Sequence, residues 1–346
     1  MGDTPIGPAS KSSILVGNLY VMMAYAFRSA NHIEVAEAGA FTFENAHNLF
    51  AHIVAEEASR QVKIGLHNNY LSRSSELDTV RGRIDVTATV TARSVSPGRV
   101  VCNYEELLPD TPHNRAVKAT IISLARHDDL QPEHKASLKR TLPYFNRVGD
   151  ESLRRIRWNN LHIHRANASY RVLLGVCELY ASGLIFGDAD GEFQAQWDPG
   201  EALDALFERF VREYFKVHYP SLSASAKLID WDLDKSASAH TGSQFLPTMR
   251  TDVTLRNGDD ILVIDTKYYS ANLQLGQSGK QSVRSAHLYQ LSAYVANAAA
   301  STSGRVSGLL LYARTDAPVQ PELDVVIGGH RLGATTIDLS SPWPIV

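Results

Sequence analysis

Residues 251–269, TDVTLRNGDDILVIDTKYY, predict a β-hairpin that carries two carboxylates and a lysine at fixed positions. The first arm is expected to run from Thr251 to Arg256, and Asn257-Gly258 favours the positive φ angles of a tight turn. The second arm begins at Ile261. The two arms should therefore pair antiparallel.

The second arm opens with an unbroken apolar run, Ile261 to Ile264, which is typical of a strand buried on both faces in the middle of a sheet. Strand side chains alternate, so Asp265 and Lys267 should point to one face and Thr266 to the other. Pairing across the turn can bring Asp252 to the face of Asp265. Two carboxylates and an ammonium would then converge at a strand end.

Buried charges are costly unless they are paired or bind a metal. Carboxylates from Asp252 and Asp265, with the backbone carbonyl of Thr266, suit a hard divalent cation such as Mg²⁺, for which Mn²⁺ can substitute. Such an ion lowers the pKa of an attacking water and stabilises charge on phosphorus, as phosphodiester hydrolysis requires. From spacing alone, an ordinary surface hairpin with ion pairs is an equally good interpretation.

Two neighbouring motifs favour catalysis. Asp252-x(12)-Asp265-Thr-Lys267 resembles the PD-(D/E)xK nuclease signature, and Gln290-x-x-x-Tyr294 resembles the motif of its RecB-like branch. The i, i+4 spacing of Gln290 and Tyr294 places both on one helix face. Upstream, Glu208 lies on a predicted helix where the superfamily often carries a further metal-associated acid.

The composition fits an ordinary globular protein of 346 residues, with 44% hydrophobic residues, 21% charged residues and a net charge of −3. This charge argues against strong nonspecific DNA binding by the whole surface. Cys102 and Cys177 have no zinc-site or disulfide spacing, which fits a reducing cytoplasm. No apolar run approaches the length of a membrane span, and no signal peptide is recognisable, so no membrane partner is expected.

Four basic residues stand out in the N-terminal part. Arg81 and Arg83 lie in Glu76–Val90, whose alternating pattern predicts a half-exposed strand pair. Arg115 and Lys118 follow Asp110-Thr111, which can cap a helix. These side chains could reach a phosphate or an acidic partner, although a solvated strand with no specific role is the simpler explanation for Arg81 and Arg83.

The order of the elements predicts two domains. An α+β domain is expected over residues 1–165, and an α/β nuclease domain of the restriction-endonuclease-like class over residues 166–346. In the second domain, predicted helices at 199–217 and 283–299 alternate with strands near 227–231, 247–256, 260–267, 306–312 and 323–327. A mixed sheet flanked by helices fits this order.

The chain as a whole resembles the McrC family, the nuclease subunits of McrBC modification-dependent restriction systems. The likeness rests on Val16 to Ala26, Arg81-Gly-Arg-Ile84, Asp110-Thr111 with Asn114-Arg115 and Lys118, Leu246 to Asp252, Ile264 to Tyr269, Leu288-Tyr-Gln290, and Gly308-Leu-Leu-Leu-Tyr312. Thr266 is a mild departure, because alanine is frequent there in the family.

The resemblance implies a Mg²⁺-dependent endonuclease acting on double-stranded, modified DNA together with McrB, a hexameric AAA+ GTPase. It also implies that the N-terminal half inserts into the pore of that ring and stimulates GTP hydrolysis. The sequence has no phosphate-binding loop of its own, since Gly276-Gln-Ser-Gly-Lys280 has the wrong glycine spacing. Two alternatives remain open: a stand-alone RecB-like DNA nuclease, and a non-catalytic activator of the motor.

Overall fold

The computed structural model describes residues 16–27, 45–92, 98–186, 195–197, 200–233, 242–269, 272–275, 279–341 and 343. It divides into two compact units: residues 45–181, here the helical unit, and residues 1–44 with 182–346, here the sheet unit. This division differs from the expected boundary at residue 165. Helix α1 (Val16–Ala26) belongs to the sheet unit, where it packs on α8 (Gly200–His218) and Asn18 donates to the carbonyl oxygens of Leu339 and Ser341.

The helical unit is built from α3 (Ala46–Ile64), α5 (Pro112–Leu124), α6 (Pro132–Thr141) and α7 (Arg171–Ser182), with short 3-10 helices at 142–145, 153–155, 158–160 and 165–170. The Thr111 hydroxyl accepts from the backbone N–H of Asn114, which confirms the predicted cap of α5. Fully buried aromatic side chains, among them Phe50, Phe145 and Tyr180, fill the space between the helices.

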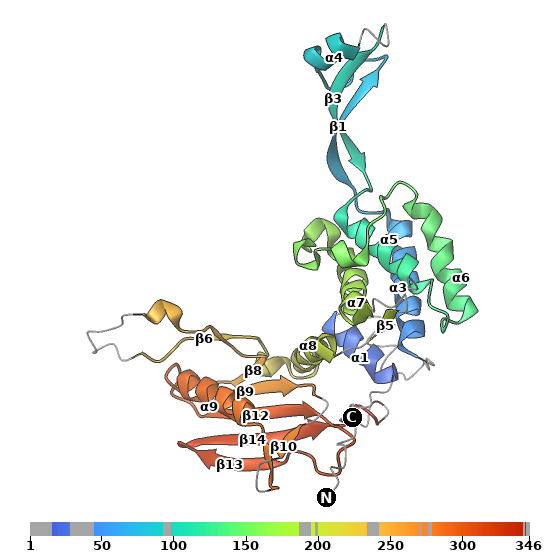
Figure 1. The fold of residues 1–346 in the computed structure, drawn as a ribbon. Helices are drawn as coiled ribbons and strands as arrows, with labels where there is room; N and C mark the ends of the chain where they lie inside the picture. The colour runs from blue at the N-terminus through green and yellow to red at the C-terminus, as the bar shows by residue number, and fades with distance from the viewer. Residues whose placement is uncertain are drawn as a thin grey trace, which may run out of the picture. The chain divides into compact units, whose positions relative to one another are not determined.

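A long antiparallel pair projects from the helical unit, as Figure 1 shows. β1 (Asn69–Leu77) pairs with β3 (Val100–Leu108) along its whole length, and β2 (Arg83–Ile84) pairs with the other edge of β3 near the tip. We call residues 69–108 the finger. The expectation of strand structure through Val90 is wrong beyond residue 85, because the Asp85 carboxylate accepts from Ala88 N–H and starts helix α4 (Val86–Ala92).

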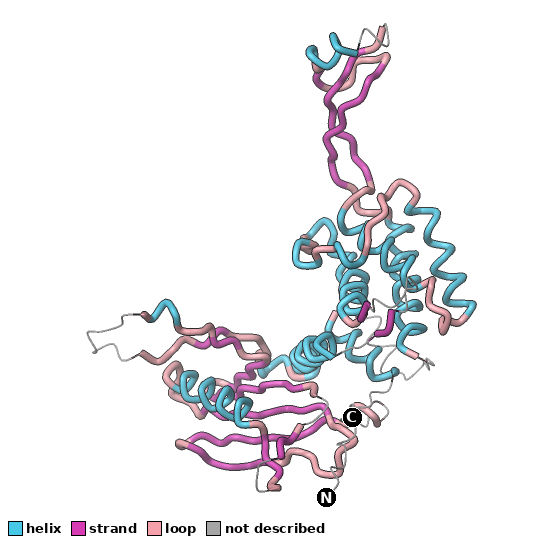
Figure 2. Tube along the Cα trace, viewed as in Figure 1, coloured by secondary structure: helices cyan, strands magenta, loops and turns pink. Residues whose placement is uncertain are grey.

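The sheet unit contains a five-stranded mixed sheet, coloured magenta in Figure 2, with strand order β13-β14-β12-β9-β8. The strands are β8 (Val253–Asn257), β9 (Asp260–Lys267), β12 (Val306–Ala313), β13 (Leu323–Ile327) and β14 (His330–Ile337). β12 runs parallel to both β9 and β14, whereas β8 and β13 pair antiparallel with their neighbours. The predicted mixed sheet flanked by helices is confirmed, although the sequence pattern does not predict β14.

Two helices position the end of β9. Helix α9 (Ser285–Ala299) packs on the sheet through Leu291 and Val295, in one buried cluster with Val263 and Leu310, whereas α8 packs against β8 and β9 outside that cluster. Shorter two-stranded pairs complete the unit: β4 (Leu184–Phe186) with β5 (Ala195–Trp197), β6 (Leu228–Ile229) with β7 (Met249–Arg250), and β10 (Leu273–Leu275) with β11 (Gln281–Val283). Further 3-10 turns lie at 220–222 and 243–245.

The predicted hairpin is present, with one adjustment at its turn. β8 and β9 pair antiparallel from Val253↔Ile264 to Asn257↔Asp260, so Asn257 already belongs to the ladder. The loop is Gly258-Asp259, and of Asn257 and Gly258 only the glycine has a positive φ, 61°. Glycine in the first loop position suits a two-residue hairpin. Within the described ranges, no helix combines the length and apolarity needed to cross a membrane.

Candidate active site

The predicted alternation brings Asp265 and Lys267 together at the end of β9. Asp265 is 1% exposed and Lys267 is 9% exposed. Lys267 Nζ lies 2.9 Å from Asp265 Oδ2 as an ion pair, and no described residue other than Lys267 provides a donor for the Asp265 carboxylate. Burial raises the pKa of Asp265 to about 6, against the opposing attraction of Lys267. A buried carboxylate whose one partner is a lysine can accept a further cation.

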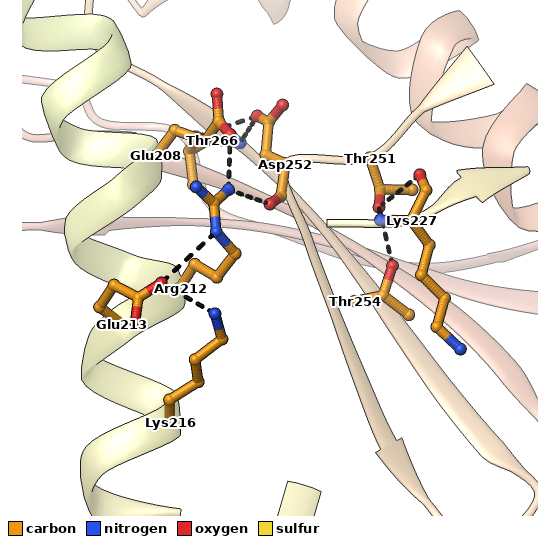
Figure 3. A network of polar contacts seen from close by, with 9 residues as sticks. All are labelled: Glu208, Arg212, Glu213, Lys216, Lys227, Thr251, Asp252, Thr254 and Thr266. Carbon is orange, nitrogen blue, oxygen red and sulfur yellow. Dashed lines mark hydrogen bonds and ion pairs between the residues drawn. The ribbon is translucent and has the colours of Figure 1, made fainter. Parts of the chain in front are cut away.

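Asp252 stands across the hairpin and is held by Thr266. Its Oδ2 accepts hydrogen bonds from the backbone N–H of Thr266 at 2.7 Å and from the Thr266 hydroxyl at 2.9 Å (Figure 3). The carboxylate of Asp252 is close enough to Asp265 to raise the pKa of Asp265. Asp252 therefore lies within electrostatic reach of Asp265, while its carboxylate is held by the Thr266 side chain, which alternation directs to the other face of β9. The role predicted for the Thr266 carbonyl stays a prediction.

Glu208 pairs with an arginine instead of lying free beside the acids. Arg212 Nη1 is 2.6 Å from Glu208 Oε1 and also donates to the backbone carbonyl of Asp252 at 2.9 Å. Figure 3 shows Arg212 between Glu208 and the Asp252 backbone. Glu208 therefore reaches the site through Arg212, and a direct or water-mediated contact between Glu208 and a metal stays a prediction.

A second acid of α8, Asp204, lies within electrostatic reach of the site, and the sequence analysis did not predict it. Asp204 Oδ1 accepts from the backbone N–H of Tyr268 at 3.0 Å. Burial raises the pKa of Asp204, while Lys267 lowers it and Asp252 raises it, so these charges lie within electrostatic reach of one another. Asp204 precedes Glu208 by one helical turn. Asp204 and Glu208 therefore lie on the same face of α8, and only the tertiary fold determines that they have different partners.

Helix α9 supplies the polar wall opposite Lys267. Gln290 Nε2 donates to the Tyr294 hydroxyl at 2.9 Å, and Lys267 Nζ lies 3.5 Å from Gln290 Oε1. The predicted common face of Gln290 and Tyr294 is confirmed. One turn earlier, the buried ring of His287 stacks on Tyr269, and burial lowers the pKa of His287 to about 4, with repulsion from Lys267 adding to the shift. His287 is therefore a neutral imidazole at pH 7.

The donors at this strand end fit a hard cation. Mg²⁺ is usually bound by one or two carboxylates and otherwise by water, so the carboxylates of Asp252 and Asp265 provide an adequate set. In the described part of the chain, no group of three or more His, Cys, Asp or Glu side chains is arranged to hold a metal ion alone. The site thus resembles an open Mg²⁺ site that keeps water ligands, and is unlike a closed structural zinc site.

The four basic residues predicted to bind a partner fall into two groups. Arg81 and Arg83 are exposed near the tip of the finger, where the Arg81 guanidinium lies 4.3 Å from the centre of the Tyr104 ring. In contrast, Arg115 forms two hydrogen bonds with Asp110, and Lys118 donates to the Val148 carbonyl and pairs with Asp150. These internal contacts give Arg115 and Lys118 a structural role, and a partner contact for them stays a prediction.

Comparison with known proteins places this geometry in a family. A family model described as "McrBC 5-methylcytosine restriction system component" matches residues 11–313. The type IV methyl-directed restriction enzyme EcoKMcrBC of Escherichia coli strain K12 is 25% identical over 338 residues, which are 96% of this chain and 95% of the relative.

A solved half-complex of Thermococcus gammatolerans McrB AAA+ hexamers with bound McrC aligns with a TM-score of 0.51 and 17% identity. The alignment covers 93% of this chain and 70% of the matched chain, and at this identity it shows likeness of fold alone. The family match extends over most of the chain, including the finger, Asp252 before β8 and Asp265 of β9. The chain therefore belongs to the family of McrBC 5-methylcytosine restriction system components, as its motifs predicted.

Proposed function

We propose that this chain is the endonuclease subunit of an McrBC-type restriction complex and hydrolyses DNA phosphodiester bonds with Mg²⁺. One observation carries the proposal: Asp265 and Lys267 form a buried ion pair at the end of β9 within electrostatic reach of Asp252, and Lys267 is the only donor to the Asp265 carboxylate among the described residues. A purely structural ion pair has no need for a second acid beside it. A cation and a phosphate account for both features.

Each side chain has a separate task in this proposal. Asp252 and Asp265 would hold Mg²⁺ or Mn²⁺, with the Thr266 carbonyl as a third oxygen, and the ion would supply a water of lowered pKa and neutralise charge on the phosphate. Thr266 fixes the Asp252 carboxylate through two hydrogen bonds. Lys267 is held between Asp265 and Gln290, and Tyr294 orients the Gln290 amide so that its oxygen faces the ammonium.

Substitutions at Asp265 and Lys267 test this division of tasks. Asp265→Asn should abolish both Mn²⁺ binding, followed by calorimetry, and DNA cleavage. Lys267→Ala should retain Mn²⁺ binding but cut about a hundredfold more slowly, because a preorganised charge near the phosphate acts mainly in the transition state. Lys216→Ala on α8, whose lysine pairs with Glu213, is the matched control.

Stability must be measured alongside activity. Removing Lys267 leaves the Asp265 carboxylate unpaired and buried, which costs about 3–5 kcal/mol in comparable sites. Lys267→Arg, which keeps the charge, serves as a second variant with a smaller effect on folding. Cleavage that survives Asp265→Asn, or equal loss of Mn²⁺ affinity in the Lys267 variants, would contradict the proposed roles.

The finger supports a second part of the proposal, in which the chain binds and stimulates an McrB-like AAA+ GTPase ring. Besides Arg81 and Arg83, the finger tip exposes Val80, Val86 and Val90 by 57–68% of their surface. A protruding element with apolar and cationic side chains fits a partner's pore. The Thermococcus complex consists of McrB AAA+ hexamers with bound McrC, and the E. coli relative is methyl-directed, so we infer a ring partner and modified duplex DNA here as well.

GTP turnover by the partner tests the finger. Arg81→Glu with Arg83→Glu should lower stimulation at least tenfold, whereas Arg140→Glu, an exposed arginine of α6, should leave it unchanged. Asp265→Asn should stimulate normally, because coupling to the ring does not require the nuclease metal. Cleavage without any partner would indicate a stand-alone nuclease. Stimulation without cleavage in Mg²⁺ or Mn²⁺ would indicate a non-catalytic activator.

A further inference from the structure

A cavity of about 600 Å³ lies beside the candidate active site within the sheet unit. Its walls are residues 227–233 around β6, the hairpin of β8 and β9, and the C-terminal end of α9. None of the residues that line the cavity has a role in the site proposed above. The volume is ample for one nucleotide, because ligand sites commonly span about 300–1,000 Å³.

Arg256 provides a positively charged hydrogen-bond donor in the cavity. Arg256 lines the cavity from β8 opposite Ile261, and its Nε is buried without an acceptor. Among the described residues, no ion pair or hydrogen bond involves its guanidinium. A half-buried guanidinium without an anion is unfavourable, since buried charges are normally paired. A planar donor group of this kind matches a phosphate.

An aromatic and apolar surface lies in the same cavity. The Trp231 indole is half-buried and fixed, because Nε1 donates to the Pro247 carbonyl at 2.8 Å. Leu228 and Leu233 line the cavity beside it and are 68% and 40% exposed. Nucleobases stack on such fixed aromatic rings without regard to sequence. Trp231 therefore offers a platform for a base.

The charged residues that line the cavity determine how a nucleotide would be oriented in it. Lys227 is exposed, and Figure 3 shows its ammonium extending away from Thr251. Asp230 and Asp232 also line the cavity and are exposed, so they would repel a phosphate on their side. A phosphate is therefore favoured near Arg256, and a base near Trp231.

The cavity is continuous with the strand that carries the candidate active site. Val263 lines the cavity and precedes Asp265 by two residues on the same face of β9, a separation of roughly 7 Å along a strand. On α9, Ala298 lines the cavity one turn after Tyr294. This separation is comparable with the spacing of neighbouring nucleotides on an extended strand.

We propose that this cavity binds one nucleotide unit of the DNA strand adjacent to the scissile phosphate, with that unit unpaired from the duplex, its phosphate on Arg256 and its base on Trp231. The inference rests on the proposed nuclease function, which it deepens by adding a substrate subsite. A free nucleotide has the same chemistry as a strand unit, and the experiment below separates the two.

The test is equilibrium binding of a labelled oligothymidylate of about 12 nucleotides to the full chain in EDTA, where metal-dependent cleavage is blocked. Arg256→Met should weaken binding about tenfold or more, and should reduce the salt dependence by about 0.7 in log–log slope, the contribution of one phosphate contact on a single strand. Arg331→Met is the matched control, because Arg331 is an exposed arginine paired with Asp324 at the other edge of the sheet.

Tryptophan fluorescence and a free nucleotide complete the test. The oligonucleotide should quench part of the tryptophan emission, and Trp231→Phe should remove that quenching while retaining an aromatic platform. Thymidine monophosphate alone should bind far more weakly than the strand. Equal strand affinity for Arg256→Met and Arg331→Met would overturn the proposal, as would Arg256-dependent binding of the free nucleotide alone.

These outcomes are separable from failure of the nuclease proposal. If wild-type protein cuts DNA and Arg256→Met binds the strand normally, the subsite is wrong and the nuclease stands. If strand binding depends on Arg256 but the chain never cuts DNA in Mg²⁺ or Mn²⁺, the strand contact stands and hydrolysis is wrong.

Discussion

Gly308→Ala is expected to disturb the candidate active site without touching any of its side chains. Gly308 lies on β12 beneath α9, and a Cβ atom there would stand 2.8 Å from Leu291 Cγ and 2.8 Å from Val295 Cγ2. Carbon atoms in contact prefer about 3.5–4.0 Å. Helix α9 must therefore move outward by roughly 0.7–1 Å, or its side chains must leave their favoured rotamers.

The size of both effects follows from this displacement. Overpacking a buried contact costs about 1–3 kcal/mol, which lowers the melting temperature by about 2–4 °C per kcal/mol in a unit of this size. Gln290 is the neighbour of Leu291, and its Oε1 is already 3.5 Å from Lys267 Nζ, so a small outward shift breaks that contact. A misplacement near 1 Å can slow catalysis by up to about a hundredfold.

The assay compares thermal unfolding, Mn²⁺ affinity and DNA cleavage for Gly308→Ala and for Gly17→Ala. Gly17 lies in α1 with no atom within 4 Å of an added Cβ, so its substitution should be neutral or stabilising by up to about 1 kcal/mol. Gly308→Ala should lose stability and cleavage rate while Mn²⁺ affinity is retained, because Asp252 and Asp265 are not on α9. Wild-type cleavage by a Gly308→Ala protein would refute this reasoning.

Two further predictions concern the helical unit. Arg115→Met removes two hydrogen bonds to Asp110, which hold the pKa of Asp110 at about 2. Urea unfolding at pH 7 should show a decrease of about 1–2 kcal/mol in the free energy of unfolding. An unchanged free energy would mean that this contact does not stabilise the fold. Burial, reinforced by repulsion from the stacked His47, lowers the pKa of His127 to about 4. Between pH 6.5 and 4, His127 is protonated in the unfolded chain but stays neutral in the folded chain. The free energy of unfolding should therefore decrease by about 1–2 kcal/mol as the pH is lowered from 6.5 to 4, after allowance for partial exposure. His127→Gln should flatten the fall in urea titrations at pH 7.5 and 5.0, and an unchanged fall would assign it to other groups.

Much of the candidate site is local in the chain, and for that reason the sequence predicts it. Alternation along one strand places Asp265 and Lys267 on the same face, and the tight turn returns Asp252 to the Thr266 amide, within electrostatic reach of Asp265. Likewise, the i, i+4 spacing places Gln290 against Tyr294, and the cap at Thr111 needs only the next three residues. Each prediction depends on backbone geometry over a few residues, which side-chain type and spacing determine.

Contacts between distant segments were decided only by the tertiary structure. Two acids one turn apart on α8 look equivalent in sequence, but packing on β9 places Asp204 against the Tyr268 amide and leaves Glu208 to Arg212. Similarly, the long register of β1 with β3, the place of β14 between β12 and β13, and the union of α1 with the sheet unit join residues far apart in the chain. Such pairings depend on burial of complementary surfaces across the whole fold, which no short window of sequence contains.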